Sequence, residues 1–286
     1  MKVYRSISSL TKKIKEIKKQ GKAIGLVPTM GFLHEGHMSL IRRAAKDTDC
    51  VIVSIFVNPA QFGPKEDFKK YPRDMKKDLK LCEKEAVDII FAPEAREMYP
   101  EGFATYVKVE RITDMLCGAS RPGHFSGVAT VVAKLFNIIM PDIAYFGQKD
   151  GQQAAVIRRM AKDLDLPVKI KVEPVVREKD GLAMSSRNIY LNSEERNQAV
   201  CLYKALKLAK VLFNKGERDS KKIINKMSQL INNEDKAKIE YISIVDTEEL
   251  RGMKRISGQA LVAVAVWVGK TRLIDNIILD NSFSLK

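Results

Sequence analysis

Short apolar segments alternate with helical patterns through the first two-thirds of the chain. The apolar segments cover residues 24–27, 51–57, 88–92, 143–146 and 168–172, and apolar residues recur every three or four positions between them. Strands that are apolar throughout are typical of parallel sheets with helices on both faces. The sequence therefore predicts an α/β fold, with a Rossmann-like, doubly wound parallel sheet in a domain over residues 1–182. Ligands of such sheets bind beyond the carboxyl ends of the strands.

The pattern changes in the last hundred residues. A long helical pattern covers 194–213 and a second covers 220–231, after which the apolar segments 239–245, 260–268 and 273–279 follow one another without intervening helices. Helices followed by neighbouring strands are typical of α+β architecture. We therefore expect a separate, smaller C-terminal α+β domain over residues 183–286.

Composition narrows the class of protein. The 286 residues are 45% hydrophobic and 30% charged, and the longest apolar stretch, at 260–268, is too short to span a membrane. The N-terminus lacks a secretory signal pattern, so we expect a cytoplasmic protein without a membrane partner. Four scattered cysteines fit free thiols better than a zinc site. The net charge of +15 fits nucleic-acid binding, anionic small substrates or a lysine-rich surface.

Two of the three histidines lie three residues apart, directly after the first long apolar segment. His34 and His37 flank Gly36 at the expected start of a helix. A helix N-terminus offers unpaired N–H groups and a positive dipole, and the imidazoles add donors that can stabilise charge on phosphoryl oxygens. The alternative is two surface loop residues, which the position after a buried strand disfavours. The spacing does not match a zinc H-E-x-x-H site.

Polar residues also follow other predicted strands. Asn58 and Gln61 come after the second long strand and are either ordinary turn residues or amides that bind hydroxyls and carboxylates. Gly147, Lys149 and Gln153 follow the strand at 143–146 and offer close backbone approach, a positive charge and an amide. Their expected position at one edge of the sheet favours a role for these motifs in ligand binding.

Two further motifs leave alternatives open. The segment 184–188 (MSSRN) is either a helix cap with a surface arginine or a triphosphate site at the domain boundary. The segment 121–127 (RPGHFSG) contains the last histidine and is either a structured turn or a mobile phosphate lid.

Taken together, these motifs resemble the pantoate–β-alanine ligase family of the nucleotidyltransferase superfamily with the H-x-G-H motif. The resemblance spans about residues 20–195 and rests on six ordered segments: PTMG running into HEGH at 28–37, NPAQFG at 58–63, YPR at 71–73, RPGHF at 121–125, FGQKD at 146–150 and MSSRN at 184–188. The H-x-G-H element alone implies only the wider superfamily, which includes class I aminoacyl-tRNA synthetases.

The resemblance implies a two-step reaction in pantothenate and coenzyme A biosynthesis. The carboxylate of (R)-pantoate attacks the α-phosphorus of Mg²⁺-bound ATP to form pantoyl adenylate and pyrophosphate. The amine of β-alanine then displaces AMP to form pantothenate. The family also implies a cytoplasmic homodimer whose smaller C-terminal domain acts as a lid.

The family roles carry over residue by residue. Catalytic roles are implied for His37, the expected proton donor, and for His34, Lys149, Ser185, Ser186 and Arg187. Pantoate and β-alanine are expected at Gln61, Gln153 and Asn58. The residues that the resemblance places at ATP are Met30, Gly31, Phe32, Leu33, His34, Glu35, Gly36, His37, Gly147, Gln148, Lys149, Asp150, Val176, Met184, Ser185, Ser186 and Arg187.

Two positions depart from the family, and two other functions compete. The family usually has Glu in place of Gln148 and an aromatic residue in place of Gly151, so we expect altered affinity with the reaction retained. One competitor is another adenylyl- or cytidylyltransferase, which pantoate-independent ATP–pyrophosphate exchange would reveal. The other is an RNA-binding or tRNA-synthetase-like protein. We expect no nucleic-acid partner, because the sequence lacks the interleaved Arg and aromatic residues on which single-strand binders stack bases. A tRNA synthetase would also normally carry a lysine-containing K-M-S-K-S-type loop and a further tRNA-binding domain, whereas this sequence has MSSR at 184–187 and about 100 residues after it.

Overall fold

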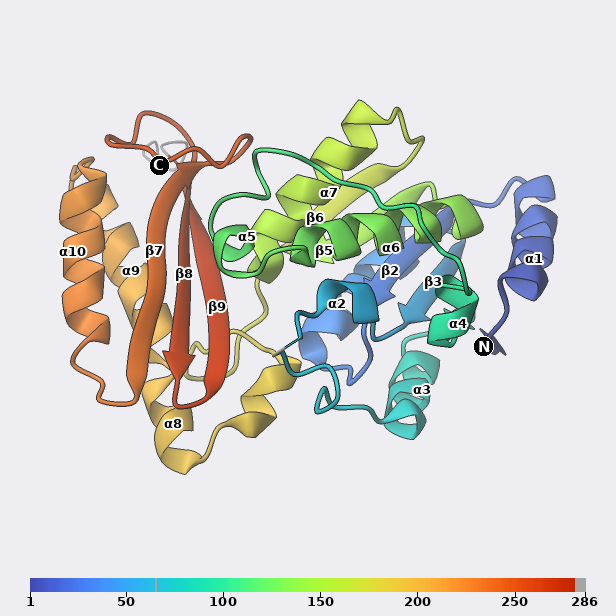
Figure 1. Cartoon of the computed structure of the whole chain (residues 1–286), viewed down its shortest axis with the longest axis horizontal. Helices are drawn as coiled ribbons and strands as arrows, with labels where there is room; N and C mark the ends of the chain where they lie inside the picture. Colours follow the sequence, from blue (N-terminus) through green and yellow to red (C-terminus); the bar gives the residue numbers. More distant parts are fainter. Residues whose placement is uncertain (65, 281–286) are drawn as a thin grey trace. The chain divides into compact units, whose positions relative to one another are not determined.

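The computed structural model describes residues 1–64 and 66–280, and the chain divides into two compact units (Figure 1). Of the described residues, unit 1 comprises those within 1–110, 120–148 and 156–174, and unit 2 comprises those within 111–119, 149–155 and 175–280. The boundary after residue 182 stays a prediction. The segments 111–119 and 149–155 cluster with the C-terminal part of the chain.

Unit 1 is built on a six-stranded parallel sheet, which confirms the predicted doubly wound α/β fold. The strand order is β1-β4-β3-β2-β5-β6, with β1 (Lys2–Tyr4), β2 (Ile24–Thr29), β3 (Cys50–Ile55), β4 (Ile89–Phe91), β5 (Ile143–Gly147) and β6 (Lys169–Glu173). From β2 the chain adds β3 and β4 on one side and β5 and β6 on the other. Because crossovers between parallel strands are right-handed, these two directions place the connecting helices on opposite faces of the sheet. The order reverses between β2 and its neighbours β3 and β5, where ligands of such sheets bind.

Along the chain, helices and short 3-10 turns connect these strands. They are α1 (Ile7–Lys19), α2 (Glu35–Asp47), α3 (Met75–Lys84), α4 (Ala95–Met98), α5 (Cys117–Ser120), α6 (His124–Ile139) and α7 (Gly151–Asp163), with the short 3-10 turns η1 (Pro59–Gln61) and η2 (Gln148–Asp150). α2 and α3 bury Leu40, Ile41, Ala44 and Cys82 against sheet residues such as Val27 and Val53. This packing explains why the strand residues on that face of the sheet, such as Val51, Val53 and Ile55, are apolar.

Several predicted bounds need correction. The helix expected at 128–139 already begins at His124, so residues 124–127 are helical, residues 121–123 form a turn, and the lid interpretation of the segment 121–127 stays untested. The short strand β1 was not predicted, because three residues carry too little periodicity. The pattern at 194–213 is two helices, α8 (Ser193–Gln198) and α9 (Cys201–Asn214). Strand β6 is partly exposed along its length, since it lies at the sheet edge.

Unit 2 contains the predicted antiparallel strands. β7 (Ala237–Asp246), β8 (Ala260–Val268) and β9 (Thr271–Leu279) form a three-stranded sheet in that order. α9 and α10 (Ser220–Ile231) cover one face, where Leu206, Ile223 and Met227 are buried with Val262 and Val264. The 3-10 turn η3 (Ser186–Tyr190) precedes α8. Within the described residues, none of these or the other helices has the length and apolar character needed to cross a bilayer.

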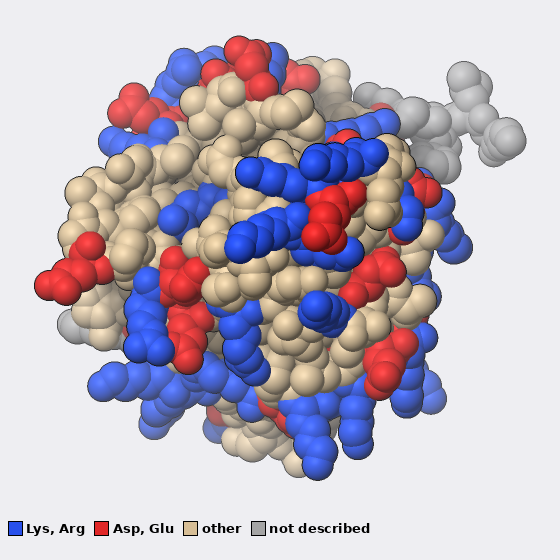
Figure 2. Space-filling model, turned by 90° about the vertical axis from the view of Figure 1, so that its right-hand side faces the viewer, with Lys and Arg blue, Asp and Glu red and all other residues tan. Residues whose placement is uncertain are grey.

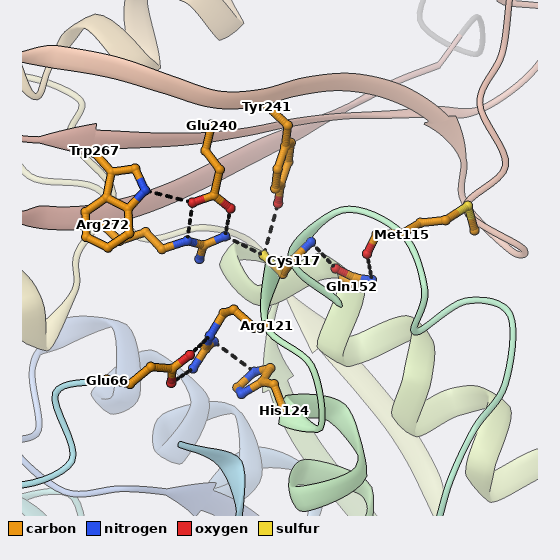
Figure 3. A network of polar contacts seen from close by, with 10 residues as sticks. All are labelled: Glu66, Met115, Cys117, Arg121, His124, Gln152, Glu240, Tyr241, Trp267 and Arg272. Carbon is orange, nitrogen blue, oxygen red and sulfur yellow. Dashed lines mark hydrogen bonds and ion pairs between the residues drawn. The ribbon is translucent and has the colours of Figure 1, made fainter. Parts of the chain in front are cut away.

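Side-chain hydrogen bonds attach the segment 111–119 to the rest of unit 2 (Figure 3). The Cys117 thiol lies 3.0 Å from the Tyr241 hydroxyl on β7, and the Cys117 N–H donates to the Gln152 amide oxygen at 2.9 Å. Gln152 in turn donates to the carbonyls of Ile112 and Met115. These bonds join segments that are distant in sequence, which explains why periodicity alone did not group them.

The positive charge is dispersed on the face drawn in Figure 2, where groups of Lys and Arg side chains alternate with Asp and Glu. The +15 charge of the chain therefore does not form one continuous patch on that face.

Candidate active site

The loop after β2 is fixed by a buried carboxylate. Asp78, on α3, is 1% exposed and accepts the backbone N–H groups of Phe32 and Leu33, each at 2.8 Å, one on each carboxylate oxygen. Gly31 and Phe32 both have positive φ angles, at 82° and 51°, a conformation that is costly for Phe32. Burial raises the pKa of Asp78, and the two N–H bonds oppose that rise. Asp78 therefore holds an otherwise unfavourable turn in front of His34.

The two histidines cap the helix that follows this loop. His34 is the N-cap of α2, its Nδ1 accepts the Gly36 N–H at 3.2 Å, and His37 Nδ1 accepts the His34 N–H at 3.3 Å. The ring centroids are 4.1 Å apart. Because each Nδ1 is an acceptor, a neutral ring carries its proton on Nε2. The pair thus supplies two Nε2 donors at the positive end of a 13-residue helix.

This arrangement differs from the expected anion site in one respect. The sequence suggested that N–H groups at this helix start are unpaired. Instead, the Gly36 N–H donates to the His34 ring and the His34 N–H donates to the His37 ring. Glu35 forms an ion pair with Arg42 on the same helix. The imidazole nitrogens, rather than these backbone groups, are the candidate phosphate donors.

The loop after β3 presents a buried pair of amides. Gln61 is 9% exposed and Asn58 is 1% exposed, and Asn58 Nδ2 donates to Gln61 Oε1 at 3.1 Å and to the Gly127 carbonyl at 3.1 Å. Asn58 Oδ1 accepts the Tyr99 hydroxyl at 2.8 Å. Gln61 Nε2 donates to the Met30 sulfur at 3.1 Å, which links this loop to the loop after β2.

A glycine allows α6 to approach this amide pair. A Cβ atom added to Gly127 would lie 2.2 Å from the Ala60 carbonyl oxygen and 2.6 Å from the Gln61 nitrogen. Backbone atoms cannot yield to such a contact as a flexible side chain can. The position of Gln61 therefore depends on the missing side chain of Gly127.

In unit 2, the loop before α7 is tied to strand β9. Asn276 Nδ2 donates to the Lys149 carbonyl at 2.9 Å, and the Lys149 amine lies 3.5 Å from the Asp150 carboxylate. A Cβ atom on Gly151 would lie 3.3 Å from Asn276 Nδ2. The departure at Gly151 thus faces the amide that supports Lys149. Gln153 is partly buried on the first turn of α7.

The remaining predicted residues of unit 2 lie on neighbouring segments. The Met184 N–H donates to the Val176 carbonyl at 3.0 Å, and Ser185 caps η3 by accepting the Arg187 N–H at 3.3 Å. Ser186 is buried. Ser185 thus caps a 3-10 turn and Arg187 is half-buried, so the first interpretation of the segment 184–188 holds only for the cap, and the phosphate interpretation stays untested.

A buried ion pair supports this segment. Arg177 donates to the two carboxylate oxygens of Asp275 at 2.5 and 3.0 Å, and it also donates to the Gly181 carbonyl. Burial raises the pKa of Asp275, and Arg177 opposes that rise. The pair anchors the chain next to Val176.

The structure brings some predicted residues together within each unit. Unit 1 joins Met30 to Gln61, Gln61 to Asn58 and His34 to His37, and it also contains Gly147 and Gln148. Unit 2 joins Val176 to Met184, and it also contains Lys149, Asp150, Gln153, Ser185, Ser186 and Arg187.

Comparison with known proteins decides the family. The model of the family described as pantoate-beta-alanine ligase matches residues 2–278. The chain belongs to the pantoate–β-alanine ligase family. A pantothenate synthetase of Caldicellulosiruptor bescii is 55% identical over 280 residues, covering 98% of this chain and 99% of the relative. One of Thermotoga petrophila is 56% identical over 279 residues, covering 98% and 100%.

Solved structures of pantoate–β-alanine ligases share the fold. The pantothenate synthetase of Thermus thermophilus matches with a TM-score of 0.93 and 43% identity, covering 97% of this chain and 99% of that one. The enzyme of Francisella tularensis, solved with β-γ ATP and β-alanine, matches with a TM-score of 0.81 and 35% identity, covering 97% of each chain. The family reaction is the ATP-dependent condensation of pantoate with β-alanine through a pantoyl adenylate, which releases AMP and pyrophosphate.

Sequence reasoning missed the residues that support the site. Asp78, Tyr99, Gly127 and Asn276 are not among the predicted site residues. Asp78 lies on the helical face that also buries Cys82, four residues later, and a carboxylate on a buried face is the one signal that could have found it.

Proposed function

We propose that His34 and His37 bind the triphosphate of ATP so that pantoate can be adenylated. The observation that carries this proposal is the paired imidazoles at the N-terminus of α2, each with Nδ1 occupied by a backbone N–H. Their Nε2 donors, together with the helix dipole, suit an anion. The neighbouring residues Met30, Gly31, Phe32, Leu33, Glu35 and Gly36 complete the proposed site in unit 1, together with Gly147 and Gln148.

The proposed chemistry needs positioning and charge stabilisation. The pantoate carboxylate forms a bond to the α-phosphorus as the bond to the pyrophosphate oxygen breaks, and donors such as His34 and the proton donor His37 stabilise the phosphoryl oxygens. The β-alanine amine then attacks the acyl carbon, and AMP leaves. Lys149, Ser185, Ser186 and Arg187 are the proposed catalytic residues of unit 2, and Asp150, Val176 and Met184 complete the proposed ATP set.

Gln61 and Gln153 are the proposed pantoate ligands, and Gln61 is also proposed for β-alanine. Asn58 was predicted beside the substrate, but its two amide hydrogens go to Gln61 and Gly127. We therefore assign Asn58 to orienting the Gln61 amide. The complex of the Francisella tularensis enzyme with β-γ ATP and β-alanine supports ATP and β-alanine as ligands of this chain.

Mg²⁺, the oligomeric state and the location rest on the family resemblance. Mg²⁺ is proposed to accompany ATP, because it commonly binds through substrate phosphates with one or two carboxylates. Asp150, with a half-exposed carboxylate, fits that role better than Asp78, whose oxygens both accept backbone N–H groups. A cytoplasmic homodimer is also proposed, and sedimentation at twice the mass of the chain would support it.

ATP titration calorimetry tests the role of the histidines. His34→Asn and His37→Asn keep an acceptor near the position of Nδ1 and remove the Nε2 donor. We expect each to weaken ATP binding by about tenfold, the effect of one charge-assisted hydrogen bond. Lys46→Gln, on an exposed turn of the same helix, removes a positive charge as a control and should change affinity little. Unchanged affinity in both histidine variants would contradict the proposal.

A further inference from the structure

The third histidine lies in a chain of polar contacts that ends on the backbone of Gln61. His124, the first residue of α6, places Nδ1 2.8 Å from the Gln61 carbonyl oxygen and Nε2 3.1 Å from Arg121 Nη1. Arg121 donates to both oxygens of Glu66, at 2.7 and 2.6 Å (Figure 3). We call Glu66, Arg121 and His124 the relay. All of its members lie in unit 1 with Gln61.

The contacts define the protonation of the relay. A carbonyl only accepts hydrogen bonds, so His124 must carry a proton on Nδ1. A guanidinium only donates, so Nε2 must be an unprotonated acceptor. Burial opposes ionisation of Glu66, but the hydrogen bonds and charge of Arg121 outweigh it and lower the pKa of Glu66. The relay is therefore an ionised Glu66, a cationic Arg121 and a neutral His124, and each of the four contacts joins a donor to an acceptor.

The Gln61 backbone needs this support. Gln61 ends the three-residue turn η1, in which the Gln61 N–H donates to Asn58 and the Phe62 N–H donates to Pro59. Neither bond uses the Gln61 carbonyl, which instead accepts from His124. The side-chain amide is held separately by Asn58 and Met30. Rotation of the Gln61 peptide would move the point from which this amide is projected.

We propose that Glu66, Arg121 and His124 are positioning residues that fix the backbone of Gln61 and so orient its amide for pantoate. The proposal rests on the proposed role of Gln61 as a pantoate ligand. His124 acts through its Nδ1–H, while Arg121 and Glu66 fix the tautomer and the orientation of the ring. The relay touches Gln61 by one neutral hydrogen bond, so its effect should be confined to the substrates proposed for Gln61, which are pantoate and β-alanine.

Two substitutions at His124 separate its two nitrogens. His124→Asn retains an N–H near the position of Nδ1, and His124→Gln places its amide near the position of Nε2. We expect His124→Gln to raise the KM for pantoate about tenfold, and His124→Asn to raise it no more than about threefold. The KM for ATP should stay within about twofold in both, because the His34 loop is held independently by Asp78.

The Gln61→Ala background distinguishes this inference from the proposed function. If Gln61→Ala leaves the KM for pantoate unchanged, the proposed role of Gln61 is wrong. If Gln61→Ala raises it but His124→Gln does not, the relay is not a positioning device. If both raise it, we expect His124→Gln to add no further increase in the Gln61→Ala background. Full additivity of the two effects would contradict the proposal.

Glu66→Gln keeps the test decisive if His124→Gln fails to fold. The variant retains one acceptor for Arg121 and removes the charge, so we expect the KM for pantoate to rise about threefold with unchanged KM for ATP. An equal rise in the KM values for pantoate and ATP, or a rise in neither, would overturn the proposal that the relay positions Gln61.

Discussion

The loops after β2 and β5 are supported by different chemistry. The loop after β2 is held by an anionic side chain, Asp78, which accepts two backbone N–H groups. The loop after β5 is held at Lys149 by a neutral amide, Asn276, which donates to one carbonyl. Hydrogen bonds to charged groups are stronger than neutral ones, and an N–H left unpaired in a buried place is costly. Substitution of Asp78, which supports the loop of the histidines, should therefore reduce activity more than substitution of Asn276, which supports the loop of Lys149.

The largest effect is expected at Asp78. In Asp78→Asn, the side-chain NH₂ group must face one of the two backbone N–H groups, so we expect kcat/KM for ATP to fall about 100-fold and the free energy of unfolding to fall by about 2 kcal/mol. Steady-state kinetics and urea unfolding measure these effects. Asp74→Asn is the matched control, because Asn caps the start of α3 as well as Asp does. If Asp78→Asn had the kinetics of the wild-type protein, the claim that the charged Asp78 supports the loop after β2 more strongly than Asn276 supports the loop after β5 would be wrong.

A steric change in a third loop separates geometric from electrostatic support. Gly127→Ala places a methyl group against the Ala60 carbonyl and should displace η1, raising the KM for pantoate by about tenfold or more. Gly63→Ala, two residues after η1, is the control, since the nearest atom to its Cβ would be 3.7 Å away. An equal KM for pantoate in the two variants would show that the close approach of α6 to η1 does not affect pantoate binding.

A smaller effect is expected at the loop of Lys149. Asn276→Ala removes one neutral hydrogen bond, so we expect kcat to fall about fivefold, consistent with about 1 kcal/mol. Asn232→Ala, at the exposed end of α10, is the control and should leave kcat unchanged. The comparison of the two loops would be reversed if Asn276→Ala lost more activity than Asp78→Asn.

A carboxylate away from these loops should affect stability without affecting activity. At the end of α2, Asp47 accepts from Lys171 at 2.6 Å, from Tyr145 at 3.0 Å and from Arg43 at 2.8 Å, and the Lys171 bond contributes most to lowering the pKa of Asp47 to about 2. The folded-state pKa lies below the unfolded value, so this stabilisation is complete above about pH 5 and is lost as pH falls towards 2.

Asp47→Asn tests this pH dependence. We expect it to lower the free energy of unfolding by about 1–2 kcal/mol at pH 7 and by clearly less at pH 3, with kcat unchanged. Urea unfolding at the two pH values measures the difference. A loss of stability that is the same at both would show that the charge of Asp47 is not the stabilising feature.

The sequence predicted the elements with strong periodicity and the order of the motifs. The segment 220–231 is a helix and 260–268 is a strand with the predicted bounds, because their apolar spacing has one interpretation. The break between α8 and α9 escaped notice, since Ala199 and Val200 continue the apolar pattern. The supports of the site were also missed. Asp78 reaches Phe32 over 46 positions, and His124 reaches Gln61 over 63, so neither pairing leaves a local signal.

Pantoate-dependent ATP–pyrophosphate exchange without β-alanine tests the paired histidines most directly, because it isolates the adenylation step. In a His34→Asn/His37→Asn double variant with an unchanged circular dichroism spectrum, we expect the exchange rate to fall at least about 100-fold from that of the wild-type protein. An exchange rate within a few-fold of wild type would contradict the claim that these imidazoles hold the triphosphate for attack by pantoate.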